Sequence, residues 1–140
     1  MTANAVVVDT NVVVAALLTG DASSPPAQIL DGMLGGLFPY LLSPDLLAEY
    51  RAVLLRPAIC SRHGLSGEEV DQLLEELVAG AIWREPASGI PAPDPGDDHL
   101  WALTGCHPGI CLVTGDRLLL DNPHPGIVVV SPRYFVSTLT

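Results

Sequence analysis

The feature that most limits how this chain folds is a series of short apolar runs, rich in β-branched residues, that stop at polar residues. Short continuous runs of this kind are typical of strands buried on both faces, as in parallel sheets covered by helices. The predicted strands are residues 5–8, 40–42, 82–84, 110–113 and 127–130.

Segments with helical spacing and helix-starting residues separate these runs. Ser66 with Glu69 three residues later forms a capping box, and Ser43 followed by Pro44 marks another helix start. The predicted helices are residues 12–18, 27–34, 45–55, 66–79 and 97–104, with an extended connection at 86–95 and a closing helical turn after Pro132. Strands alternating with helices predict the α/β class, as a three-layer α/β/α sandwich with a mainly parallel central sheet. We expect one domain over residues 1–140.

The chain is acidic and contains no lysine. The sequence has six arginines and 16 acidic residues, which gives a formal net charge of −10 with neutral histidines. The missing lysine excludes a P-loop, a Schiff-base enzyme and the phosphoaspartate enzymes that use a lysine beside the acyl phosphate. So few cations also argue against wrapping duplex DNA electrostatically. If the protein acts on nucleic acid, metal ions must therefore supply much of the positive charge.

The cysteines and the N-terminus indicate a reducing compartment. Cys60, Cys106 and Cys111 are odd in number and form no Cys-x-x-Cys pair, which favours reduced thiols in a cytoplasmic protein. A zinc site from Cys106, His107 and Cys111 is weakly indicated, because no fourth ligand has a recognisable spacing. The apolar run near the N-terminus is short and lacks a preceding basic region, so we expect no signal peptide and no membrane span.

Acidic residues lie where a parallel sheet binds its ligands. Asp9 and Asp116 follow two predicted strands, and Asp97 and Asp98 begin the helix that leads into the second of these strands. Glu49 lies mid-helix among apolar neighbours, where a charge is unfavourable unless something offsets it. Each acid alone also has a purely structural interpretation, as a helix cap, a turn residue or a solvated charge. The hypothesis of a functional site therefore depends on all of these acids together and not on any one of them.

Carboxylates drawn together in this way would repel one another. One pair at about 4 Å costs on the order of 4 kcal/mol at an effective dielectric near 20. Oxygen ligands select hard divalent ions, Mg²⁺ or Mn²⁺, which bind phosphate oxygens and activate water. The acids therefore predict a phosphodiesterase or nuclease whose metal joins an acidic cleft to a polyanionic substrate.

Five segments, taken in order, resemble the PIN domain. They include Val-Val-Val-Asp-Thr-Asn-Val, Ser-Pro-Asp-Leu-Leu-Ala-Glu-Tyr and Val-Thr-Gly-Asp-Arg-Leu-Leu, and they occupy residues 6–12, 43–50, 94–99, 113–119 and 129–135. More narrowly, they look like the bacterial PIN proteins that are toxin components of toxin–antitoxin pairs. The resemblance implies a PIN-like fold, a ribonuclease dependent on Mg²⁺ or Mn²⁺, a cognate antitoxin that occludes the site, and self-association as a dimer through the helices.

The resemblance also assigns roles to particular residues. The implied metal-binding and catalytic acids are Asp9, Glu49, Asp97 or Asp98, and Asp116, supported by Asn11 and Thr114. Counting back from Thr114 slightly favours Asp98 over Asp97. Arg51 and Arg117 are the nearest candidates for touching an RNA backbone.

One position departs from the family pattern. Leu118 stands where such proteins often carry a second acid after Thr-Gly-Asp. This keeps open an alternative, a catalytically weak or inactive PIN-like binding module that acts through a protein partner. A phosphoaspartate phosphatase with Asp9 as nucleophile fits poorly, because Asn11 replaces its usual second aspartate and the lysine is missing.

Overall fold

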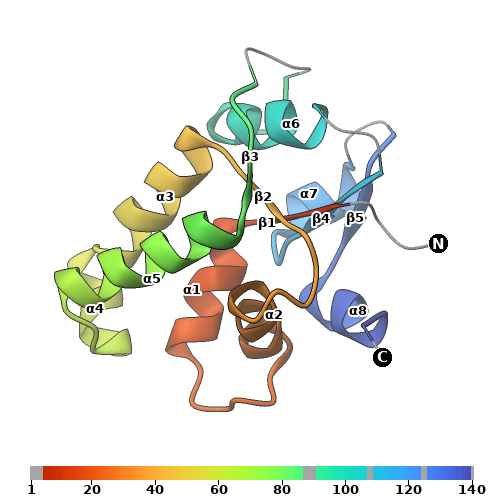
Figure 1. Cartoon of the computed structure of the whole chain (residues 1–140). Coiled ribbons are helices and arrows are strands. Elements are labelled where there is room, and N and C mark those ends of the chain that lie inside the picture. The colour runs from red at the N-terminus through yellow and green to blue at the C-terminus, as the bar shows by residue number, and fades with distance from the viewer. Residues whose placement is uncertain (1–4, 87–90, 107–108, 124–125, 140) are drawn as a thin grey trace.

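A parallel sheet forms the centre of the computed structural model, which describes residues 5–86, 91–106, 109–123 and 126–139 (Figure 1). β1 (Ala5–Val8) pairs with β4 (Ile110–Val113), which pairs with β5 (Val128–Val130). β2 (Leu41–Leu42) pairs with β3 (Ile82–Trp83), and a parallel bridge between Val6 and Tyr40 connects this pair to β1. The strand order is therefore β3-β2-β1-β4-β5, and the predicted strands are confirmed with ends that shift by one residue.

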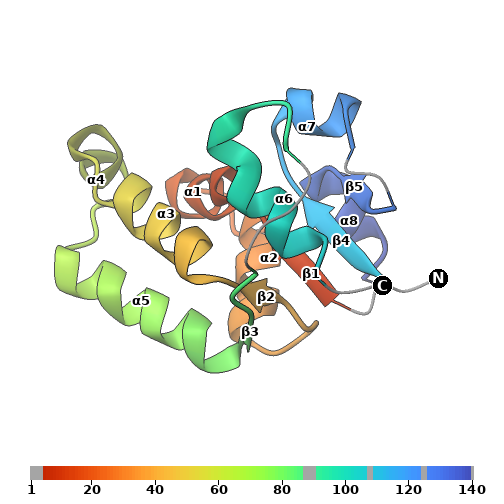
Figure 2. The same cartoon turned by 90° about the horizontal axis from the view of Figure 1, so that it is seen from above.

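Helices cover both faces of this sheet. They are α1 (Thr10–Leu18), α2 (Pro25–Leu34), α3 (Pro44–Leu54), α4 (Pro57–His63), α5 (Gly67–Gly80), α6 (Asp98–Thr104), α7 (Arg117–Asp121) and α8 (Pro132–Ser137), with a 3₁₀ turn, η1 (Pro95–Asp97), before α6. Figures 1 and 2 show α6 on one side of the sheet, α1, α2 and α8 on the other, and α3, α4 and α5 at one end. The α/β class with a parallel sheet is thus confirmed. Within the described ranges, no helix has the length and apolar character needed to cross a membrane.

Two short helices, α4 and α7, are absent from the sequence-based prediction. Pro57 does mark the end of α3, but it also occupies the first position of α4, where a missing N–H costs nothing. α7 has five residues, Arg-Leu-Leu-Leu-Asp, which are too few to show a helical period. Two predicted starts were also late: α1 begins directly after its cap Asp9, and α2 begins at Pro25 after its cap Ser24.

Tyr50 connects the helical end of the molecule to the sheet. Its side chain is wholly buried among apolar residues, and its hydroxyl donates a hydrogen bond to the carbonyl of Val8, the last residue of β1. Glu49 and Asp9 directly adjoin these two residues along the chain. The bond therefore fixes α3 against the end of β1 at the place where two of the predicted site acids occur.

Replacing Tyr50 with phenylalanine should lower the free energy of unfolding by about 1 kcal/mol, because it removes one buried hydrogen bond while keeping the ring. Urea unfolding measures this change. Tyr134→Phe is the matched control, since Tyr134 is exposed and its substitution should change stability by less than about 0.5 kcal/mol. Equal stabilities for the two variants would show that the Tyr50 hydroxyl contributes nothing.

Candidate active site

The register of the sheet brings two predicted acids to one edge. Val8 of β1 lies opposite Val113 of β4, so Asp9 and Thr114 leave the sheet at the same level. The N–H of Asp9 continues the ladder by donating to the Val113 carbonyl at 2.9 Å. Asp116, two residues beyond Thr114, is the N-cap of α7. Asp9 and Asp116 therefore both follow the carboxyl ends of neighbouring parallel strands, where α/β sheets bind ligands.

Asp9 is a buried carboxylate that accepts several hydrogen bonds. Only 5% of the residue is exposed. Its Oδ1 accepts the N–H of Thr10 at 2.8 Å, which caps α1, and its Oδ2 accepts the Thr114 hydroxyl at 2.8 Å and the Asn11 amide at 3.2 Å. The structural interpretation of Asp9 as a helix cap is therefore correct, and it applies to the same side chain that faces the other acids.

Asn11 and Thr114 connect Asp9 to the loop that carries Asp116. The Thr114 hydroxyl accepts the N–H of Asp116 at 2.9 Å, and it also accepts the Asn11 amide at 3.3 Å. Oδ1 of Asn11 accepts the N–H of Gly115 at 2.9 Å. Both residues named as polar supports thus lie between the two acids and hold them in a fixed relation.

Two other acids lie close enough to Asp9 to raise its pKa by repulsion. Burial raises the pKa of Asp9, and the charges of Glu49 and Asp116 raise it further, against the lowering effect of the hydrogen bonds from Thr114 and Thr10.

The pKa of Asp97 rises to about 6, first because of burial and then because of the neighbouring carboxylates. These neighbours are Asp9, Asp94, Asp116 and Glu49. The charges of Glu49 and Asp116 therefore act on both Asp9 and Asp97, although these four acids come from four separate elements.

Asp97, rather than Asp98, faces this group. Asp97 occupies the N-cap position of α6, yet its side chain makes no capping hydrogen bond. Asp98 is exposed, and its Oδ1 accepts the N–H of Ala92 at 2.8 Å in the preceding connection. The slight preference for Asp98 came from counting along the chain, whereas the structure places Asp97 in the field of Asp9, Glu49 and Asp116; which of the two would bind a metal stays a prediction.

His99 is a site residue that the sequence reasoning missed. Its Nε2 lies 3.0 Å from Oε2 of Glu49, and the pair links α6 to α3. The His99 side chain is 18% exposed, and its Nδ1 is buried without a hydrogen-bond partner among the described residues. This histidine is a polar partner of the half-buried Glu49 carboxylate. Its position directly after two candidate acids was the available signal.

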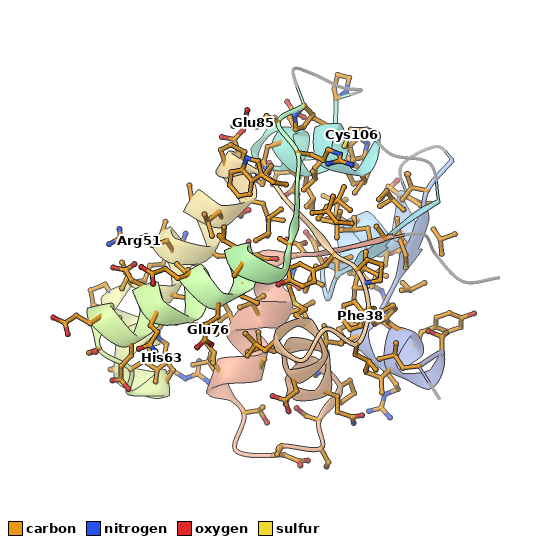
Figure 3. The ribbon with its side chains drawn as sticks, in the orientation of Figure 1. Phe38, Arg51, His63, Glu76, Glu85 and Cys106 are labelled. Carbon is orange, nitrogen blue, oxygen red and sulfur yellow. The ribbon has the colours of Figure 1, made fainter. Side chains whose placement is uncertain are left out.

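The two arginines proposed to contact RNA differ in their surroundings. Nε of Arg51 lies 2.8 Å from Oδ1 of Asp71, and Figure 3 shows Arg51 on the flank of α3 beside α5. Asp71 therefore already neutralises this cation. Arg117 follows Asp116 directly, is highly exposed, and lies 3.7 Å from the carboxylate of Asp121. Arg117 is the better placed of the two to meet a substrate near the acids.

Leu118 occupies the first turn of α7 and is 44% exposed. Its N–H donates to Oδ1 of Asp116 at 2.9 Å, so its backbone, but not its side chain, orients an acid. The segment from Thr114 to Leu118 thus contributes one acid, Asp116, to the site, as the sequence indicates.

The four acids fit a hard divalent ion by their chemistry and charge. They supply only carboxylate oxygens. Burial and then repulsion raise the pKa of Asp97, and a dication would relieve the repulsion. Among the described residues, no three His, Cys, Asp or Glu side chains already stand close enough to hold a metal. Binding would therefore require the carboxylates to move closer together.

The weakly indicated zinc site gains no support. Burial raises the pKa of Cys111 to about 11, which opposes the thiolate that zinc requires. The thiol of Cys106 lies 2.9 Å from the carbonyl of Leu103, and His107 falls outside the described residues. Cys60, Cys106 and Cys111 are all free thiols.

Comparison with known proteins gives one result that bears on this site. A family model described as PIN domain matches residues 5–118, a range that contains Asp9, Glu49, Asp97 and Asp116. No curated protein matches the chain.

Metal-free protein should lose stability as the pH rises from about 4 toward 7, to the extent that Asp97 contributes. Its pKa is about 6 in the folded protein against 3.8 for a free side chain, so in this window the folded state binds more protons than the unfolded state. Losing those protons therefore favours unfolding. Melting temperatures in EDTA between pH 4.5 and 7.5 measure the slope. Asp97→Asn should lessen the loss, whereas Asp31→Asn, an exposed acid on α2, should not. Equal slopes for wild type and Asp97→Asn would refute this.

A double-mutant cycle on His99 and Glu49 should give a coupling free energy of about 0.5–1.5 kcal/mol, because a partly buried polar contact of 3.0 Å joins Nε2 of His99 to the Glu49 carboxylate. The cycle uses His99→Leu, Glu49→Gln and the double variant, with urea unfolding as the measurement. The exposed pair Arg117 and Asp121 serves as the control and should couple more weakly. A coupling near zero for His99 and Glu49 would mean that the contact does not hold Glu49.

Proposed function

The chain belongs to the PIN domain family, whose members are generally nucleases, and from this premise we propose that it is a ribonuclease dependent on Mg²⁺ or Mn²⁺ that hydrolyses RNA phosphodiester bonds. The observation that carries the proposal is the electrostatic coupling of Asp9, Glu49, Asp97 and Asp116. Asp9 and Asp116 also cap helices, but burial and then the nearby negative charges raise the pKa of Asp97 to about 6, and this is more repulsion than helix capping requires. Site residues of this kind are candidates for catalysis.

In the proposed mechanism, the four acids would hold the ion, which when bound supplies charge neutralisation and an activated water. The surrounding residues keep the acids in place. Thr114 and Asn11 orient Asp9, and His99 restrains Glu49 through its Nε2. Such supporting hydrogen bonds fix the direction of a ligand oxygen before the ion arrives.

Arg117 would contribute the local positive charge that the substrate requires. It adjoins Asp116 in the chain, and among the residues that the structure describes only the long contact to Asp121 competes for its guanidinium. A guanidinium can hold two oxygens of one phosphate, which would orient the RNA backbone at the acids.

Leu118 favours a second candidate function. The missing acid, together with carboxylates not yet close enough to hold a metal, is compatible with a PIN-like binding module that acts through a protein partner. This module would retain the fold and the coupled acids but would cleave RNA slowly or not at all.

We extend the proposal to biology on the basis of the resemblance alone. The protein would be the toxin of a toxin–antitoxin pair, inhibited by an antitoxin that covers the acids, and it would self-associate as a dimer. Free thiols at Cys60, Cys106 and Cys111 are compatible with action in the reducing cytoplasm.

Mn²⁺ should raise the melting temperature and support cleavage of single-stranded RNA. Ligand at a hundred times its dissociation constant stabilises a folded protein by about 2.7 kcal/mol. Asp9→Asn should reduce the Mn²⁺-induced shift and lower the cleavage rate by about a hundredfold or more. Thermal melting and a gel assay of labelled RNA measure the two effects, with circular dichroism to verify folding.

Asp45→Asn is the matched control for this experiment, because Asp45 is an exposed acid on α3 outside the coupled group. It should leave both the shift and the cleavage rate unchanged. Millimolar Mn²⁺ that neither shifts the melting temperature nor supports cleavage would favour the binding module.

A further inference from the structure

A groove borders the acids on the side of α1, α2 and α8. Its volume is about 460 Å³, within the range of small-ligand sites. The residues that line it are Asn11, Val12, Ala15, Pro26, Gly115, Asp116 and Pro132. Asn11 and Asp116 also belong to the acid site, so the groove is continuous with it. A polymer that binds at the acids would therefore also pass over this groove.

The lining of the groove disfavours phosphate. Among the described residues that line it, Asp116 is the only charged one and no cation is present. The polar atoms of Asn11 are already bonded, its Oδ1 to the N–H of Gly115 and its Nδ2 to Asp9 and Thr114. The remaining walls are aliphatic or proline side chains, which suit an uncharged, flat, largely apolar group.

Positive charge occurs beside the groove rather than inside it. Two of the lining residues, Asp116 and Pro132, are each followed in the chain by an exposed arginine, Arg117 and Arg133. This arrangement matches a nucleotide in which the base enters an apolar recess while the phosphates on either side remain with solvent and cations.

We propose that this groove is a subsite for one unpaired nucleobase of the RNA strand, adjacent to the phosphodiester bond that lies at the acids. The inference rests on the proposed function in taking single-stranded RNA as the substrate, and it adds the place on the protein where one unpaired base binds. Bases in an A-form duplex are stacked and paired, so none can enter a recess of this kind.

The test fills the groove at Ala15, a half-buried residue of α1 outside the acid site. Fluorescence anisotropy in Ca²⁺, a hard dication that carboxylates also bind and that takes the place of Mn²⁺, measures the affinity for two probes, and a gel verifies that both stay intact. One is a labelled single-stranded RNA oligonucleotide, and the other is an abasic strand of equal length with the same phosphates. Wild type should prefer the RNA, and Ala15→Phe should weaken RNA binding about tenfold while leaving the abasic strand unchanged.

Ala79→Phe is the matched control, because it places the same side chain on an exposed alanine of α5 away from the groove, and it should change neither affinity. Ala15→Leu, a smaller and helix-compatible change, tests the same point if Ala15→Phe melts at a much lower temperature. Unchanged RNA affinity in the Ala15 variants, equal weakening for both probes, or no preference of wild type for RNA would each overturn the inference.

Cleavage separates this inference from the proposed function. Base-dependent binding at Ala15 without any Mn²⁺-dependent cleavage would leave the subsite in place and overturn the ribonuclease. If Ala15→Phe changes neither KM nor kcat for RNA cleavage, the subsite is overturned but the ribonuclease is not.

Discussion

The burial of the Asp9 carboxylate is the constraint on which the rest of the site depends. A charge at this depth must be hydrogen-bonded, and the pairing of β1 with β4 brings Thr114 to it across the sheet. The same pairing sets Asp116 on the same edge, while the bond from Tyr50 to Val8 positions the helix that carries Glu49. A few contacts among buried groups thus determine where the acids lie.

The strands and two of the acids could be predicted because their signals are local. A short β-branched run predicts a buried strand without knowledge of its partner, and Asp9 and Asp116 follow such runs directly. The rule that ligands bind beyond the carboxyl ends of parallel strands then brings them together. α4 and α7 could not be predicted, because helices of seven and five residues are too short for a periodic pattern and begin at residues that also fit turns.

The finer geometry of the site depends on contacts between distant segments. Nothing local distinguishes Asp97 from Asp98, because the direction of each side chain follows from η1 and from the connection that carries Ala92. The pairing of Glu49 with His99 requires α3 and α6 to pack together, and the pairing of Arg51 with Asp71 requires α3 to lie beside α5. The sequence indicates which residue types the site contains, whereas the packing of helices decides which of them meet.

The hydroxyl of Thr114 has an evolutionary consequence. It donates one hydrogen bond, to Asp9, and accepts two, from Asn11 and from the Asp116 backbone, which exhausts what a hydroxyl oxygen can do. Among the twenty amino acids, only serine offers the same three bonds from a side chain of this size. Natural variation at position 114 should therefore be confined to threonine and serine, even where the exposed position of Leu118 accepts many residues.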